Sequence, residues 1–286
     1  MARFDWYQAT VGAEVPDIRA CLSDLVERPV WEPQKRAKQG YAFADHLIGP
    51  DGTAAQIWWG GSHPFPHVVL SGGDAHEGAM LLRARWPEEQ AVSRVDSCID
   101  YIEPGAYDRL QGLALQVAAA ERVTVGTAGD HLLTMKGRTV YLGAPSSHTR
   151  LRVYDKAEQL RGVFAKDPAK LAEIPEHLAR FECQVRPQTS RARYEASKAD
   201  PMAVMGSAKW MRVLMGLVAG IELEPWQAGK VWRQSDDDRA YAAVLAQYGG
   251  MLKRLRDDLG SWECVGLQIG QDLSDRADAV RRGLKR

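Results

Sequence analysis

Apolar and polar residues alternate along much of the first two thirds of the chain, as in strands that bury one face. The alternation is clearest over residues 92–102, 149–156 and 178–187. Aromatic and β-branched residues predict further strands over 4–11, 67–73 and 138–143, and two within 41–61 that are joined by a Gly-Pro-Asp-Gly turn. These strands predict an antiparallel sheet with one exposed face.

Helical spacing of apolar residues separates some of these strands, over residues 16–27, 74–86 and 104–123. Beyond the last strand, helical patterns dominate to the end of the chain. The sequence therefore predicts an α+β fold, in which a sheet-bearing domain of residues 1–190 with flanking helices precedes a mostly helical C-terminal region of residues 191–286.

Composition limits the classes of protein that fit this pattern. The 286 residues include 37 Lys and Arg and 37 Asp and Glu, so the formal net charge is zero. This balance excludes a protein that coats nucleic acid by bulk charge. Hydrophobic residues make up 45% of the chain, which is ordinary for a globular protein.

The cysteines and apolar runs bear on where the protein works. Cys21, Cys98, Cys183 and Cys264 show no Cys-x-x-Cys spacing, which argues against a disulfide framework and a structural zinc site. No apolar run approaches the roughly 20 residues of a membrane span, and the N-terminus lacks the apolar core of a signal peptide. We therefore expect a cytoplasmic protein without a membrane segment.

One predicted strand presents a row of cations around a tyrosine. Successive side chains of a strand point to opposite faces. The residues that share one face of strand 149–156 are Arg150, Arg152, Tyr154 and Lys156. A tyrosine between cations on an exposed face is a candidate nucleophile, since the cations would lower the pKa of the phenol and hold phosphate oxygens nearby.

Two other predicted strands present carboxylates. One shared face consists of Arg94, Asp96, Cys98 and Asp100, and the other of Arg180, Glu182, Gln184 and Arg186. Carboxylate oxygens suit a hard divalent metal ion, so Asp96, Asp100 and Glu182 are candidate metal ligands.

The three strands would form one site if they paired with these faces aligned. Carboxylates, a tyrosine and cations would then suit metal-assisted attack of the tyrosine on a phosphodiester. Charged faces on alternating strands are also ordinary in antiparallel sheets, and this alternative stays open.

Four short motifs follow one another in a characteristic order. They are Arg-x-Asp, Tyr-x-Gly-x-x-x-Ser, Arg-x-Tyr-x-Lys and Arg-x-Glu, found in the runs RVDSCIDY (94–101), YLGAPSS (141–147), RVYDK (152–156) and RFECQVRP (180–187). In these motifs the chain resembles the replication initiation factor family, which includes rolling-circle initiators of plasmids and filamentous phages and some relaxases. The similarity covers roughly residues 4–190.

The resemblance implies a site-specific, metal-dependent nickase and strand transferase of a phage or plasmid. Tyr154 would attack one strand at an origin, become linked to the 5′ phosphate and leave a 3′-OH, with Arg152 and Lys156 as catalytic neighbours.

The resemblance also implies ligands and partners. Asp96, Asp100 and Glu182 would hold Mg²⁺ or Mn²⁺. The residues expected to contact DNA are Arg94, Arg138, His148, Arg150, Arg180 and Arg186. Origin DNA, single-stranded at the nick, is the expected partner. Because the sequence has no ATPase or helicase motif, we also expect a host helicase and a polymerase as partners. A homodimer is left open. The C-terminal helices would help in origin recognition or dimerisation.

The sequence departs from the family pattern in two ways. The turn of residues 143–147 lacks the basic residue expected within it, and no second tyrosine adjoins Tyr154. A two-tyrosine mechanism is therefore not supported, and Tyr101, Tyr107 and Tyr141 remain alternative nucleophiles.

Other features are weighed against plainer explanations. The run HPFPH (63–67) favours a loop over a metal site, because three residues separate its histidines. One ring of the pair Trp58–Trp59 would face outward from a strand and could stack on a base, although core packing or a subunit contact is favoured.

Two other functions remain open, a non-catalytic DNA-binding regulator on the same scaffold and a phosphotransferase or nuclease that uses water. The zero net charge does not exclude DNA. Residues 136–156 contain five basic residues and one acidic residue, and local charge decides whether a phosphate backbone is bound.

Overall fold

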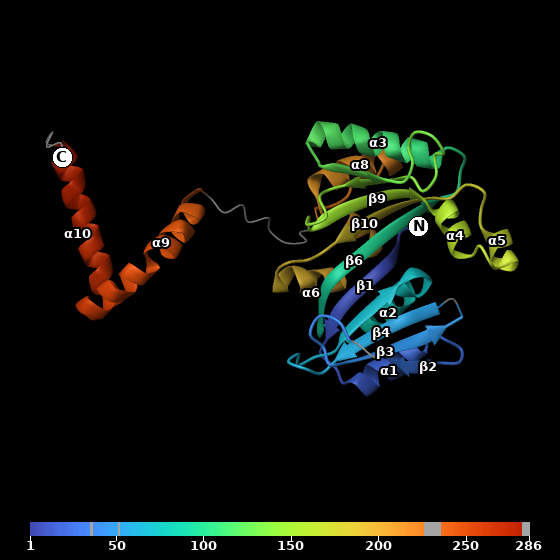
Figure 1. Ribbon diagram of the computed structural model, residues 1–286, viewed down its shortest axis with the longest axis horizontal. Coiled ribbons are helices and arrows are strands. Elements are labelled where there is room, and N and C mark those ends of the chain that lie inside the picture. Colours follow the sequence, from blue (N-terminus) through green and yellow to red (C-terminus); the bar gives the residue numbers. More distant parts are fainter. Residues whose placement is uncertain (35–36, 51, 226–235, 282–286) are drawn as a thin grey trace. The chain divides into compact units, whose positions relative to one another are not determined.

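A computed structural model describes residues 1–34, 37–50, 52–225 and 236–281. The chain forms two compact units, Met1–Lys230 and Val231–Arg286, and each is described by itself. The first unit contains the whole sheet (Figure 1).

Ten antiparallel strands form a single sheet in the order β2-β3-β4-β5-β1-β6-β10-β9-β8-β7. The strands are β1 (Arg3–Val11), β2 (Val30–Pro33), β3 (Phe43–Gly49), β4 (Gly52–Trp59), β5 (His67–Ser71), β6 (Gln90–Tyr101), β7 (Val125–Ala128), β8 (Thr139–Leu142), β9 (Thr149–Asp155) and β10 (Ala179–Val185). The predicted α+β fold with an antiparallel sheet is confirmed.

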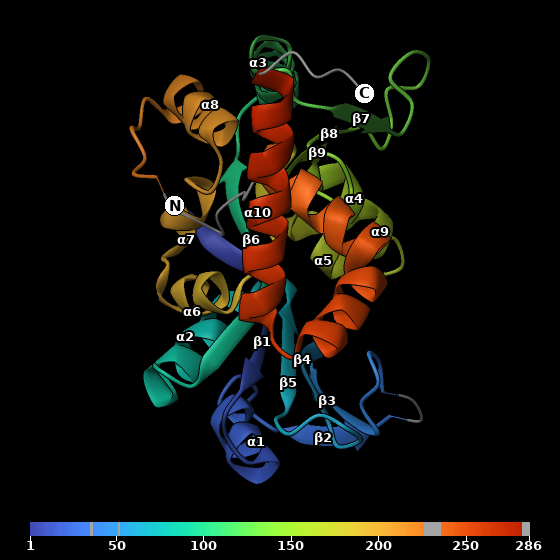
Figure 2. The same ribbon diagram turned by 90° about the vertical axis from the view of Figure 1, so that its left-hand side faces the viewer.

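Helices cover one face of this sheet. They are α1 (Val15–Ser23), α2 (Ala75–Arg85), which follows the short helix η1 (Gly72–Asp74), α3 (Ala106–Glu121), α6 (Ser190–Lys198), α7 (Pro201–Met205) and α8 (Lys209–Ala219). Figure 2 shows α2, α6, α7 and α8 on one side of β1 and β6, and α4 (Lys156–Val163) and α5 (Pro168–Glu173) on the other. The core lies between the sheet and the covering helices, and Tyr7, Phe181 and Leu151 are fully buried in it.

The alternation of each strand decides which side chains reach this core. In β9, Leu151 and Val153 are fully buried in the core, and in β10 the same is true of Phe181 and Cys183. Their neighbours along the strands point to the opposite side. We call that side, which carries Gln8, Asp96, Arg152 and Glu182 among others, the polar face.

Three of the helices beyond the predicted boundary at residue 190 pack on the sheet unit. Ser97 of β6 donates its hydroxyl hydrogen bond to the carbonyl of Pro201 at 2.6 Å, and Arg83 of α2 donates to the carbonyl of Ala196 at 3.0 Å. The compact unit accordingly extends to Lys230. As a division of function, the boundary at residue 190 stays a prediction.

The second unit contains two helices, α9 (Asp236–Leu259) and α10 (Trp262–Arg281), which contact each other. The described part of the chain contains no helix that is long and apolar enough to cross a membrane.

Candidate active site

Strand β10 lies between β6 and β9, and the pairing aligns their polar residues. Glu182 lies opposite Arg152 of β9, and Arg180 lies between Asp100 of β6 and Tyr154 of β9. The register therefore confirms the assumption that the three polar faces form one surface.

Tyr154 is nearly buried on this surface, with 6% of its area exposed. Its hydroxyl donates to Oε2 of Glu182 at 3.2 Å. The Cζ atom of Arg152 lies 5.2 Å and the Nζ atom of Lys156 lies 5.8 Å from the ring centroid. Burial, and then the charge of Glu182, raises the pKa of the phenol. The expectation of an exposed tyrosine with a lowered pKa is therefore wrong, because desolvation of the phenolate outweighs the attraction of the cations.

Glu182 connects the tyrosine to the cations. Its carboxylate is 1% exposed and accepts hydrogen bonds from Arg152 and from Tyr154. Burial raises the pKa of Glu182, although the charge of Arg152 acts against this shift. A carboxylate that accepts the phenol hydrogen bond and has a raised pKa is positioned to take that proton.

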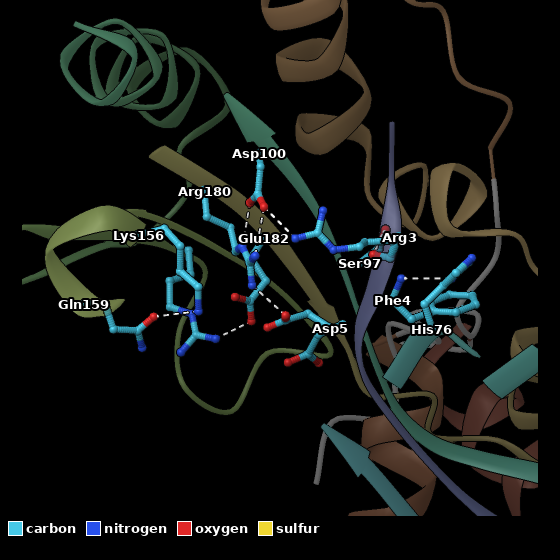
Figure 3. Close-up of polar contacts among 12 residues, drawn as sticks. Arg3, Phe4, Asp5, His76, Ser97, Asp100, Lys156, Gln159, Arg180 and Glu182 are labelled. Carbon is cyan, nitrogen blue, oxygen red and sulfur yellow. Dashed lines mark hydrogen bonds and ion pairs between the residues drawn. The ribbon is translucent and has the colours of Figure 1, made fainter. Parts of the chain in front are cut away.

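Arg180 joins two further carboxylates (Figure 3). Its Nε and Nη2 donate to Asp100 at 2.6 and 2.9 Å, and its Nη1 donates to Asp5 at 2.6 Å. Arg3 donates a further hydrogen bond to Asp100 at 2.5 Å. Burial by itself would raise the pKa of Asp100, but the hydrogen bonds and charges of Arg180 and Arg3 together lower it.

Asp5 is a residue of this site that sequence reasoning missed. The pairing of β1 with β6 shifts register between Phe4 and Trp6, which marks a β-bulge at Asp5. Phe4 and Tyr7 are both fully buried in the core although they are three residues apart. That spacing in an otherwise alternating strand was the available signal for the bulge, because regular alternation separates residues of one face by two.

Asp96 has an arginine partner of its own. The Nε of Arg94 donates to its Oδ1 at 2.9 Å, and Nε2 of Gln184 lies 3.4 Å from its Oδ2. Asp96 is 1% exposed, and burial raises its pKa despite the hydrogen bond and charge of Arg94.

These contacts bear on the expected metal ion. Asp96, Asp100 and Glu182 each bind at least one arginine, and a divalent ion would have to displace Arg94 or Arg152 to reach two of them. Within the described residues, no three His, Cys, Asp or Glu side chains are grouped to hold a metal ion. The carboxylates as arranged do not fit such an ion, and the metal requirement stays a prediction.

The cations predicted to contact DNA lie in different settings. Arg94 and Arg180 bind the carboxylates described above. Arg150 lies on the polar face with its Cζ 4.1 Å from the ring of Tyr141. The exposed side chain of Arg186 donates to the carbonyl of Pro145, and the backbone of Arg186 donates to the carbonyl of His148, at 2.8 and 2.7 Å. These contacts bring Arg186 and His148 to the turn between β8 and β9.

A cavity of about 320 Å³ lies beside the tyrosine. Arg138, Tyr141, Arg152, Tyr154 and Glu158 are among its lining residues. Tyr154 thus reaches the cavity although most of its surface is buried. The cavity offers space beside Tyr154, with two arginines among its lining residues.

The alternative tyrosines are separated by their faces. Tyr107 of α3 is buried in the core, and Tyr101 packs against the core from the end of β6. Tyr141 lies opposite Arg152 on the polar face and lines the cavity. Of the three alternatives, Tyr141 alone shares the cavity with Tyr154.

The run at residues 63–67 forms part of an aromatic cluster. The ring of His63 stacks on Tyr41 at 4.1 Å, and His67 lies between Tyr41 and Trp58 at 5.9 and 5.6 Å. Both nitrogens of His67 have partners, Gln8 at 2.8 Å and Thr10 at 3.1 Å. These histidines therefore contribute to packing. Trp58 belongs to the same cluster, and 5% of its area is exposed.

The fold is similar to a solved structure described as "Structure of Rolling Circle Replication Initiator Protein from Geobacillus stearothermophilus". The TM-score is 0.51 at 16% sequence identity, over 79% of this chain and 99% of that chain. No family model and no curated protein matches the sequence. At this identity the similarity shows a shared fold.

Proposed function

We propose that this protein initiates rolling-circle replication by nicking one DNA strand at an origin through a covalent 5′-phosphotyrosine. The observation that carries the proposal is the hydrogen bond from Tyr154 to the buried carboxylate of Glu182, beside a cavity lined by Arg138 and Arg152. The shared fold with a solved rolling-circle initiator supports it.

The chemistry proceeds by an in-line exchange at phosphorus. The phenolic oxygen of Tyr154 forms a bond to the phosphorus while the bond to the 3′ oxygen breaks, and Glu182 takes the phenol proton. Arg152 offsets the negative charge that develops on the phosphate. Lys156, whose pKa is lowered by burial and by the charge of Arg180, supplies a proton to the departing 3′ oxygen. The products are a 5′-phosphotyrosine and a free 3′-OH.

The raised pKa of Tyr154 explains why a base is needed. The phenol does not ionise by itself near neutral pH, so the proton must move as the bond to phosphorus forms. Rejoining follows the same path in reverse, with a 3′-OH as the nucleophile. The predicted need for Mg²⁺ or Mn²⁺ is a separate proposal, and the nicking and rejoining steps are described without a metal ion.

The decisive experiment is to trap the adduct. Single-stranded oligonucleotides tiled across the replicon that encodes the protein are incubated with it in Mg²⁺ or Mn²⁺ and separated on a denaturing gel. We expect a covalent protein–DNA band from the wild type and none from Tyr154→Phe, which should still bind the same DNA. An adduct formed by Tyr154→Phe would instead assign the nucleophile to another residue, with Tyr141 the first to test.

A second function, a non-catalytic DNA-binding regulator, is favoured by two observations. Each predicted catalytic carboxylate is neutralised by arginine, and the phenol pKa is raised rather than lowered. Sequence-specific binding of the wild type without any adduct, in either metal ion, would support this function over the nickase.

A further inference from the structure

Two leucines stand in solvent on the loop of residues 129–138, between β7 and β8. Leu132 and Leu133 are each 88% exposed, more than any other described large apolar side chain except that of the terminal Met1. Neither leucine adds to the core, so its position at the loop tip is not explained by folding.

The loop nevertheless has a defined shape. Asp130 accepts hydrogen bonds from the backbone amides of Leu132, Leu133 and Thr134 at 2.9, 2.9 and 2.8 Å. The Thr134 hydroxyl also donates to Asp130, at 2.9 Å. At the neck, the amide of Asp130 donates to the carbonyl of Lys136 at 2.9 Å. The leucines are therefore presented by a turn that is ordered before any partner arrives.

The base of the loop adjoins the cavity of the candidate active site. The amide of Gly137 donates to Oε2 of Glu158 at 2.6 Å, and Arg138 donates to the carbonyl of Met135 at 3.1 Å. Gly137, Arg138 and Glu158 all line the cavity beside Tyr154. Figure 2 shows the loop projecting outward from the edge strand β7.

Charge decides which kind of partner fits this tip. Lys136 is the cation of the loop nearest the tip, whereas Arg138 at the base is paired with Asp108 at 2.8 Å, and the carboxylate of Asp130 is engaged by its own backbone. Lys156 adds a cation in the adjoining site, where Arg152 is paired with Glu182. The two lysines suit phosphates on either side of a base, and proteins that open a duplex insert apolar wedges between bases.

We propose that Leu132 and Leu133 form a wedge that stacks on the last base pair of duplex DNA beside the nick site and keeps the single strand directed into the cavity. The proposal rests on the proposed nickase and goes beyond it by assigning the substrate as a junction of double- and single-stranded DNA. It also supplies a means of holding a junction open in a chain that carries no helicase motif.

The test compares two substrates of the same nick sequence, a single-stranded oligonucleotide and a hairpin that places a duplex end beside the nick. The variant is Leu132→Ser combined with Leu133→Ser. Both side chains are exposed, so the variant should fold. We expect the ratio of hairpin to single-strand cleavage rates to fall at least tenfold. If the wild type cleaves both substrates and the serine variant has the same ratio, the wedge is rejected while the proposed nickase is retained.

Two control variants make the result specific. Leu217→Ser removes a leucine of α8 that is 50% exposed on the helix-covered side, and it should leave the ratio as in the wild type. Leu132→Phe keeps an apolar surface that stacks on a base, and it should retain at least half of the wild-type ratio. A loss with Leu132→Phe equal to that of the serine variant would contradict stacking.

A binding measurement separates this proposal from cleavage altogether. With Tyr154→Phe as the background, 2-aminopurine replaces the adenine of the base pair next to the junction. Saturating protein should raise its fluorescence at least twofold, and the serine variant should remove most of that rise. If the serine variant instead alters only the sedimentation of the protein without DNA, the leucines serve contacts between protein molecules and the wedge is rejected.

Discussion

The hydroxyl of Tyr154 donates to Oε2 of Glu182 from the neighbouring strand at 3.2 Å, and Arg152 binds the other oxygen of the same carboxylate. The tyrosine, its base and one cation thus form a connected unit on β9 and β10. The contacts of Glu182, Arg180, His67 and Asp130, and the expected metal ion, each lead to an outcome that can be measured.

Glu182→Gln should lower the nicking rate by about 10²- to 10⁴-fold, because the amide cannot take the phenol proton. In the wild type the rate should rise with pH through the raised pKa of Glu182, and this rise should be absent in the variant. Single-turnover rates across pH test both effects. The matched control is Glu176→Gln, since the Glu176 side chain is 86% exposed. A variant with wild-type rates would exclude Glu182 as the base.

Arg180→Met should lower the free energy of unfolding by about 3–5 kcal/mol, because Asp5 and Asp100 would be left without their buried partner. Since Arg180 and Arg3 hold the pKa of Asp100 below its ordinary value, the part of the loss that comes from Asp100 should shrink as the pH falls below that ordinary value. Urea unfolding at pH 7 and pH 3.5 measures it. Arg109→Met removes a solvent-exposed pair with Glu103 and should cost less than about 1 kcal/mol. Equal losses in the two variants would contradict the structural role of Arg180.

His67 should make the fold sensitive to mild acid. Burial, and then the charges of His63 and Arg193, lowers the pKa of His67 to about 4 from an ordinary value of 6.5. The folded state therefore favours the neutral ring, and stability present above pH 6.5 is lost as the pH falls toward 4, by up to about 3 kcal/mol. Unfolding curves of the wild type and His67→Gln across this range test the effect. A similar decline in the variant would assign it to other groups.

Asp130→Ala should loosen the tip of the 129–138 loop while leaving the sheet unchanged, since all of the Asp130 contacts described lie within that loop. Amide hydrogen exchange at Leu132, Leu133 and Thr134 should accelerate at least tenfold, with β9 and β10 as internal references. Unchanged exchange would show that the loop is held by other contacts.

The expected metal ion gives a fifth prediction. Adduct formation should stop in excess EDTA and return with Mg²⁺ or Mn²⁺, and Asp96→Asn should abolish the restored activity. Arg94 and Arg152 hold Asp96 and Glu182, so the ion can reach these carboxylates only when the arginines turn to another anion, such as a DNA phosphate. The ion should therefore bind more tightly with DNA present than without it. If adduct formation is undiminished in EDTA, the predicted metal requirement is wrong, and the arginines supply the positive charge at the site.

Much of the sheet could be predicted from the sequence, because strands that bury one face show a period of two. The segments that escaped prediction are β2 and β7, which form the two edges of the sheet. All four residues of β7 are exposed, so no alternation marks it. An edge strand that buries few side chains shows no alternation of apolar and polar residues, so the sequence does not mark it as a strand.

The sequence by itself determined which side chains share a strand face, and so it grouped Arg152 with Tyr154 and Asp96 with Asp100. Only the tertiary structure decided the partner of each charge. Arg180 meets Asp5, 175 positions away, and Asp100, 80 positions away, through strand order and a bulge. Tertiary packing also decided the burial of Tyr154, which reverses the expected direction of its pKa shift. Periodicity is a local property of the backbone, whereas ion pairing and desolvation depend on distances between segments that only the folded sheet brings together.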